Sequence, residues 1–127
     1  MKVNSLRLQA SIERLGEIGA MPEGGICRPT YSEAYFHGVE YVKSLMEQAG
    51  MDVRVDRIGN VIGTYAGETD RILLTGSHID SVPYAGMFDG CLGVLGAIEA
   101  VRTLHENKKR LRHTLQVVAF AEEEGNT

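Results

Sequence analysis

The sequence predicts an α/β domain built around a mixed, partly parallel sheet. Two segments, RILLTG (71–76) and LQVVAFA (115–121), are almost wholly apolar and rich in branched side chains. Such segments are typical of strands that are buried on both faces by helices. Between them, apolar side chains recur every three or four residues from Leu92 to Leu104, which predicts a helix. A strand, a helix and a second strand in this order predict a crossover that joins parallel strands.

The residues before this crossover predict two helices and a hairpin. An apolar stripe indicates a first helix that Gly16 ends, and a second helix follows from Ser32, a favourable N-cap, to Gly50. The glycine- and proline-rich segment 16–31 between them predicts an ordered loop. The segment VRVDRIGNVIGTY (53–65) alternates in polarity around a Gly-Asn turn, which predicts a β-hairpin.

Composition narrows the class of protein. The chain has 127 residues, 43% of them hydrophobic and 24% charged, which suits a single globular domain. The net charge is −4 and basic residues do not cluster strongly, so a nucleic-acid partner is not expected. No apolar run approaches the roughly 18 residues of a membrane span, and no membrane partner is expected. The cysteines, Cys27 and Cys91, have no metal-site spacing and fit a reducing cytoplasm.

Polar side chains follow both predicted strands of the crossover. His78 and Asp80 come directly after the first strand, and Glu122, Glu123 and Glu124 end the second. Since the carboxyl ends of parallel strands lie at one edge of a sheet, we expect the two groups to lie close together. The edge therefore offers histidine and carboxylate ligands for a metal ion.

Two further features favour a metal site over an ordinary polar loop. Asp89 lies at the predicted start of the crossover helix, where the helix dipole favours a carboxylate. If the chain stays extended, His78 and Asp80 share a face, so the carboxylate can hold one ring nitrogen while the other binds a metal. Taken singly, a His-x-Asp pair, a glutamate run and an Asp-Gly turn each have ordinary surface explanations. Three adjacent glutamates at the end of a buried strand would, however, repel one another without a cation nearby.

Three further histidines and Arg28 are not expected to belong to the metal site. His37, His105 and His113 fall in helices or at the wrong end of a strand, and we expect them to be structural or surface residues. Arg28 lies in the predicted loop, where we expect a salt bridge, with contact to an anionic substrate as the alternative.

Two motifs resemble the amidase family of hydantoinase/carbamoylase type. They are GSHIDSVPYAGMFDGCLGVLGAIEAV (76–101) and VVAFAEEEGN (117–126), and the segments GGICRPTYS (24–32) and MDVRVDRIGNVIG (51–63) also match its N-terminal part. This family includes N-carbamoyl-L-amino-acid hydrolases and allantoate amidohydrolases, among the aminoacylase and carboxypeptidase-like di-metal hydrolases. The resemblance implies an α/β/α sandwich with a mixed sheet, a catalytic domain like that of the zinc exopeptidases.

The resemblance also implies a role for each residue of the cluster. His78 would bind one metal, Asp89 would bridge two metals and Glu124 would bind the second. Glu123 would be the general base, and Asp80 would orient His78. The cofactors would be two divalent cations, whether zinc, manganese or cobalt, and the peptide bond after Asp89 would be cis.

The implied activity is hydrolysis of a carbamoyl or ureido C–N bond, a linear amide or amidine, releasing ammonia and carbon dioxide. The particular substrate stays open between an N-carbamoyl-L-amino acid and allantoate. An aminopeptidase or aminoacylase of the same clan is one alternative, and a non-catalytic binding domain is another. The presence of His78, Asp89, Glu123 and Glu124 together argues against the binding domain, which has no need of a general base beside the ligands.

The resemblance implies that residues 1–127 are the N-terminal part of a longer catalytic domain. The cluster supplies two protein ligands per metal, whereas catalytic zinc usually has three and a water. In the family the remaining ligands, and a second domain that covers the site and pairs subunits into a homodimer, come later in the chain. We therefore expect residues 1–127 alone to be inactive, with metals absent or weakly held.

Overall fold

The computed structural model describes residues 1–125 and contains three helices and a four-stranded sheet in that range. The strand order is β1-β2-β4-β3; β3 runs parallel to β4, whereas the other neighbours are antiparallel. The predicted mixed sheet, hairpin and parallel crossover are thus confirmed. The elements are α1 (Ser5–Glu17), α2 (Glu33–Gln48), β1 (Asp52–Val55), β2 (Val61–Tyr65), β3 (Ile72–Ser77), α3 (Cys91–Glu106) and β4 (Thr114–Ala119).

Local sequence signals fix the ends of the first two helices. The side chains of Asn4 and Ser32 each accept a hydrogen bond from a backbone N–H in the first turn of α1 and α2. The first helix runs one residue beyond the predicted end at Gly16. After α2, Gly50 adopts a φ of +86°, a left-handed conformation that lets the chain turn into β1. None of the helices in residues 1–125 is long and apolar enough to cross a membrane.

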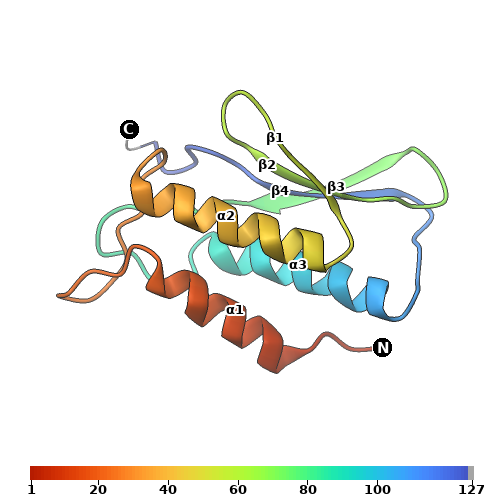
Figure 1. Cartoon of the computed structure of the whole chain (residues 1–127), viewed down its shortest axis with the longest axis horizontal. Helices are drawn as coiled ribbons and strands as arrows, with labels where there is room; N and C mark the ends of the chain where they lie inside the picture. The colour runs from red at the N-terminus through yellow and green to blue at the C-terminus, as the bar shows by residue number, and fades with distance from the viewer. Residues whose placement is uncertain (126–127) are drawn as a thin grey trace.

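The helices form a layer on one face of the sheet (Figure 1). The helices α2 and α3 pack against the strands, and α1 packs against α3 on the side away from the sheet. The core lies between sheet and helices, which confirms the α/β class with a mixed sheet. Within residues 1–125 the opposite face of the sheet carries no helix. The most completely buried apolar side chains of the core include Leu15, Val42, Met46, Val61, Leu95, Val101 and Val117.

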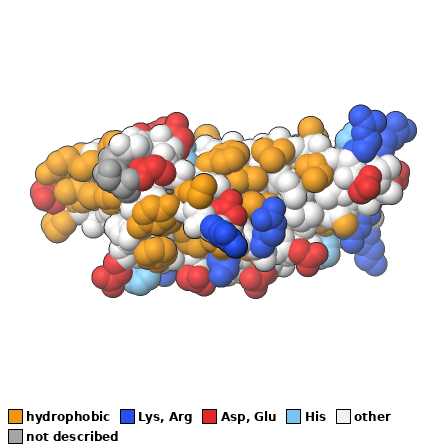
Figure 2. Space-filling view, turned by 90° about the horizontal axis from the view of Figure 1, so that it is seen from above, with side chains coloured by type: hydrophobic (Ala, Val, Ile, Leu, Met, Phe, Trp, Pro, Cys, Tyr) orange, Lys and Arg blue, Asp and Glu red, His pale blue; other side chains and the backbone are white. Residues whose placement is uncertain are grey.

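Full burial of the strand before the crossover helix was predicted, and for β3 this prediction is wrong. Ile72, Leu73 and Leu74 are between 52% and 57% exposed. The reason is position: β3 lies at the edge of the sheet, with only β4 beside it. The prediction is confirmed for β4, where Val117 and Val118 are both almost fully buried. Figure 2 shows hydrophobic side chains spread over the face seen from above.

The predicted apolar stripe of α3 is buried along its middle, exposed at its first turn and half-buried at Leu104 near its end. Leu95, Ile98 and Val101 are at most 3% exposed and belong to the core. Leu92, by contrast, is 47% exposed. The helix therefore buries its middle and leaves its first turn open beside the polar segment that precedes it.

An ion-pair network joins α1 to α3, on the side of α3 that faces away from the sheet. The Arg7 guanidinium lies 2.7 Å from the Glu99 carboxylate and 2.8 Å from the Glu106 carboxylate, measured between nitrogen and oxygen atoms. Glu99 is buried, with 5% of its surface exposed, and its carboxylate also accepts the backbone N–H of Asn4. Hydrogen bonds to Glu106 and Glu99 raise the pKa of Arg7 above its usual value. The buried Glu99 charge thus depends on Arg7.

We expect Arg7→Met to lower the free energy of unfolding by about 3 kcal/mol, because Glu99 would keep a buried charge without its partner. Urea unfolding measures this effect. Arg14→Met is the matched control on the same helix, because Arg14 and Glu17 form a solvent-exposed pair. Its loss should stay below about 1 kcal/mol. Equal losses in the two variants would show that Glu99 does not rely on Arg7.

Candidate metal centre

The polar segments that follow β3 and β4 begin at the same edge of the sheet. Ser77, the last residue of β3, pairs with Ala119, the last residue of β4, and the N–H of Phe120 donates to the Ser77 carbonyl at 2.8 Å. The chain segments that follow the two strands therefore start side by side. Residues 78–80 leave one strand and residues 121–124 leave the other, as the parallel arrangement predicted.

Three of the predicted side chains meet in space at this edge. His78, Asp89 and Glu124 each offer one ligand atom, and these atoms lie within 4.8 Å of one another. Among residues 1–125 this is the group of histidine, cysteine and acidic side chains that could hold a metal ion. Its members come from three places in the chain: the end of β3, the start of α3 and the turn after β4.

The orientation of the His78 ring is fixed from one side. The ring is buried, and its Nδ1 lies 3.0 Å from the main-chain oxygen of Asp80 and 3.4 Å from that residue's carboxylate. The main-chain oxygen is thus the nearer partner. A proton on Nδ1, donated to this oxygen, leaves Nε2 with the lone pair that a metal ion requires. Nε2 faces Glu123, whose carboxylate lies 3.4 Å away.

Asp80 connects the two ligand-bearing segments. The side chain is fully buried, and its Oδ2 accepts the backbone N–H of Glu124 at 3.0 Å. Its other oxygen, Oδ1, lies 3.4 Å from Nδ1 of His78. One carboxylate therefore contacts the histidine from β3 and the main chain of the turn after β4.

Gly90 brings Asp89 close to the His78 ring. It is the N-cap of α3 and has a φ of +73°, a left-handed conformation that favours glycine. A Cβ atom at this position would lie 2.5 Å from the His78 ring atoms, closer than real contacts allow. Among residues 1–125 no peptide bond is cis, so the cis bond implied after Asp89 is not found.

The carboxyl groups of Asp89 and Glu124 lie close enough to interact. Burial, and a hydrogen bond between the Glu124 and Asp89 carboxyl groups, raise the pKa of Glu124 above its usual value. A divalent cation between the two carboxyl groups would favour their charged forms. One imidazole with two carboxylates is a mixed nitrogen and oxygen set that zinc, manganese and cobalt accept. The residues present therefore fit a divalent cation.

The other histidines stay outside the cluster. His37 lies on α2 and His105 on α3, and both are exposed. His113 precedes β4 and lies at the opposite end of that strand from Glu124. The prediction that these residues serve the surface or the structure is confirmed for His37 and His105.

Both predictions for Arg28, a loop salt bridge and contact with an anionic substrate, are wrong. The side chain is only 1% exposed. Its guanidinium donates to the main-chain oxygens of Leu15, Ile18 and Ile79 and to the sulfur of Cys91. Burial lowers the pKa of Arg28 relative to its usual value. Three of these four partners are main-chain oxygens, which no local sequence pattern could have indicated.

Sequence reasoning also missed two residues that hold the turn after β4. The backbone N–H of Ala121 donates to the side-chain oxygen of Asn60 at 2.7 Å. The backbone N–H of Glu122 donates to the hydroxyl of Thr30 at 3.0 Å. Asn60 was assigned only to a hairpin turn and Thr30 only to a loop, because their long-range partners are backbone groups.

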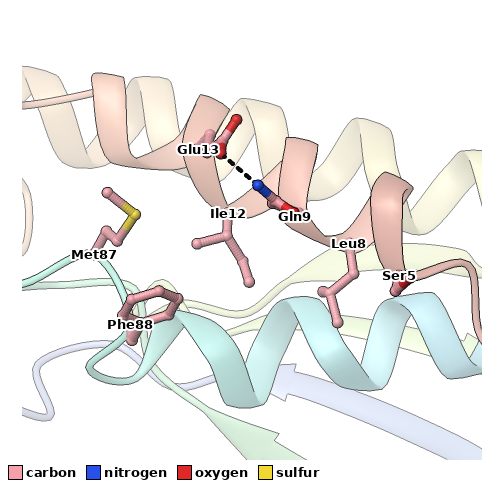
Figure 3. Close-up of a pocket in the computed structure, with 7 residues that line it drawn as sticks. All are labelled: Ser5, Leu8, Gln9, Ile12, Glu13, Met87 and Phe88. Carbon is pink, nitrogen blue, oxygen red and sulfur yellow. Dashed lines mark hydrogen bonds between the residues drawn. The ribbon is translucent and has the colours of Figure 1, made fainter.

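A separate apolar groove lies beside the start of α3. It has a volume of about 340 Å³ and runs between α1 and the segment before Asp89. In Figure 3 the side chains of Leu8, Ile12 and Phe88 surround this space, with Met87 at one end. None of the three clustered ligands lines the groove. The groove is thus distinct from the candidate metal centre.

Fold and site together define an α/β domain with a candidate metal centre at the carboxyl edge of its mixed sheet. The sequence matches the family described as Peptidase family M28 over residues 60–126. This match covers more than half of the chain, and the chain belongs to that family.

Relatives and solved structures agree with this assignment. The chain is 36% identical to a ureidoglycolate hydrolase of Arabidopsis thaliana over 98% of its length, and 40% identical to an N-carbamoyl-L-amino acid amidohydrolase of Geobacillus stearothermophilus over 94%. A crystal structure of a hydantoinase/carbamoylase family amidase from Burkholderia ambifaria superposes with a TM-score of 0.94 and 34% identity over 98% of the chain. These matches confirm the resemblance that the motifs indicated. The chain spans 26%, 30% and 31% of these three proteins, respectively.

Proposed function

We propose that this chain carries the metal centre of a hydrolase that cleaves a carbamoyl or ureido C–N bond. The observation that supports this most is the convergence of His78, Asp89 and Glu124 within 4.8 Å. Glu123 lies beside them, with its carboxylate 3.4 Å from the His78 ring. The names of two relatives, a ureidoglycolate hydrolase and an N-carbamoyl-L-amino acid amidohydrolase, support the choice of bond.

The proposed ligands divide between two divalent cations. His78 and Asp89 would hold one cation, and Asp89 and Glu124 would hold the other, with zinc, manganese and cobalt as candidates. Cations bound in this way lower the pKa of a coordinated water and stabilise negative charge on a substrate oxygen. The two carboxylates would offset two of the four positive charges, and the neutral imidazole would add a nitrogen ligand without charge.

The proposed general base is Glu123. Its side chain is 54% exposed, so water and substrate can reach it, although it adjoins the buried His78 ring. The carboxylate would accept a proton from the attacking water and return it to the leaving nitrogen. Asp80 would support this chemistry indirectly, by fixing the His78 ring and the main chain of Glu124. The products would be ammonia, carbon dioxide and a free amine.

A side-by-side assay tests the substrate class. We expect the full-length enzyme, loaded with zinc, manganese or cobalt, to release ammonia from an N-carbamoyl-L-amino acid, allantoate or ureidoglycolate. Dipeptides and N-acyl amino acids should react at least about 100-fold more slowly in kcat/KM, since each lacks the second nitrogen on the carbonyl carbon. The family's description as a peptidase favours the opposite preference, that of an aminopeptidase or aminoacylase. No turnover of any substrate would favour a non-catalytic binding domain.

The wider setting of the site is also part of this proposal. We propose that residues 1–127 are the N-terminal part of a longer catalytic domain, because the chain spans less than a third of the relatives it matches. The resemblance to the amidases further implies a homodimer of the full-length protein. A cytoplasmic location is supported by Cys27 and Cys91, which are both free thiols.

We expect Asp80→Ala to weaken metal affinity by roughly 10–100-fold without removing a ligand, since supporting carboxylates have effects of this size. Titration with zinc or manganese measures the change. Asp70→Ala is the control, because Asp70 is exposed and lies at the other end of β3. Unchanged affinity in Asp80→Ala would mean that the carboxylate does not support the ligands.

A further inference from the structure

The loop before α2 is fastened to the segment that carries His78. The side chain of Arg28 donates from Nε to the main-chain oxygen of Ile79 at 2.7 Å. Its backbone N–H donates to the hydroxyl of Ser81 at 2.8 Å, and its carbonyl accepts the Ser81 N–H at 2.9 Å. These bonds hold the chain on both sides of Asp80. The guanidinium, which stays protonated, also gives the buried Asp80 carboxylate a favourable positive charge nearby.

The same loop is fastened to the turn that carries Glu123 and Glu124. The hydroxyl of Thr30, which is 4% exposed, accepts the backbone N–H of Glu122 at 3.0 Å. Glu122 has a φ of +63°, a left-handed conformation that costs a non-glycine residue about 1 kcal/mol or more. The hydrogen bond from this residue to Thr30 therefore helps to hold a backbone conformation that is unfavourable for a glutamate. The turn directs the next two glutamates toward His78.

We propose that the segment Arg28–Thr30, here called the brace, positions both halves of the metal centre. Arg28 would fix the His78 side, and the Thr30 hydroxyl would fix the side of Glu123 and Glu124. Both side chains are almost fully buried and bind main-chain atoms, so they act through the ligands rather than on substrate. Metal–ligand distances tolerate errors of only about 0.2 Å, so small shifts of either segment weaken binding. This inference rests on the proposed function, because it takes the cluster to be a metal centre.

Paired threonine substitutions separate positioning from stability. Thr30→Val removes the hydroxyl while keeping the shape, whereas Thr30→Ser keeps the hydroxyl. Thr103→Val is the matched control: Thr103 is 7% exposed, and its hydroxyl bonds the main chain of α3 at Glu99 rather than the cluster. The measurements, made on the full-length protein, are titration with cobalt(II), the absorption spectrum of the bound cobalt and the midpoint of urea unfolding.

We expect Thr30→Val to bind cobalt about 10–100-fold more weakly than wild type, with an altered spectrum, and Thr30→Ser to restore both. Thr103→Val should bind cobalt as wild type does, whatever its unfolding midpoint. Arg28→Lys keeps the charge and loses the bond from Nε to Ile79, so it should also weaken binding, and it provides a test if Thr30→Val does not fold.

The outcomes distinguish the brace from the metal centre itself. If wild type fails to bind cobalt, the proposed metal centre is wrong, and the proposed role of the brace is wrong as well. If wild type binds and either Thr30→Val or Arg28→Lys binds with unchanged affinity and spectrum, the metal centre stands and the brace is overturned. Equal weakening in Thr30→Val and Thr103→Val would also overturn it, since general destabilisation would then explain both.

Discussion

Replacing Glu123 with glutamine is expected to lower kcat of the full-length enzyme by about 10²–10⁴-fold and to leave its metal content unchanged. Glutamine keeps the size of the side chain but cannot accept the proton of the attacking water. In the structure Glu123 lies next to the His78 ring yet is not one of the three clustered ligands. Steady-state kinetics together with elemental analysis of the metals measure both effects.

The neighbouring glutamate supplies the matched control for this substitution. Glu124 belongs to the ligand cluster, so Glu124→Ala should lose one of the two metals as well as activity. The two variants change adjacent residues of the same turn, one proposed as the base and the other as a metal ligand. Equal metal loss in both would show that the base and the ligand have been assigned to the wrong residues.

Replacing Gly90 with alanine is expected to weaken metal affinity by more than the 10–100-fold typical of losing a group that supports a ligand. The added Cβ would lie 2.5 Å from the His78 ring, and the φ of +73° is itself strained for alanine. His78 or the start of α3 must then move, which separates His78 from Asp89. Titration with zinc measures the metal affinity, and unfolding in urea measures the loss of stability.

The control for Gly90→Ala is Gly96, which lies inside α3. Gly96 is helical, and a Cβ atom there would meet nothing within 4 Å. Gly96→Ala should therefore keep full metal affinity and raise the free energy of unfolding by about 0.5–1 kcal/mol, because alanine favours the helix. If Gly90→Ala binds zinc as tightly as wild type, the close contact between Gly90 and the His78 ring is not required for metal binding.

Much of the fold could be predicted because the crossover has strong local signals. Apolar strands flank a regular helical stripe, and Ser32 and Gly50 mark the ends of α2. The exposure of β3 could not be predicted in this way, since an apolar run reports composition and not which neighbours a strand has. Only the strand order, with β3 at the edge, explains why Leu73 and Leu74 are exposed.

For the candidate site, too, some features could be predicted from the sequence and others could not. The convergence of His78 and Glu124 follows from two strands running parallel, which the sequence indicated. Thr30 and Arg28 escaped prediction because they bind main-chain atoms of segments about 50 to 90 residues away. A hydrogen bond to a backbone group leaves no complementary side chain in the sequence. Supporting residues of this kind become visible only in three dimensions.

Anomalous X-ray diffraction from crystals of the full-length protein grown with zinc would locate the metal ions themselves. We expect a peak about 2.0–2.2 Å from Nε2 of His78 and from carboxylate oxygens of Asp89, with a second peak bonded to Asp89 and Glu124. Crystals of the His78→Ala variant should lose the first peak. Zinc bound only at other residues, or no zinc at this edge of the sheet, would contradict the assignment of a metal centre.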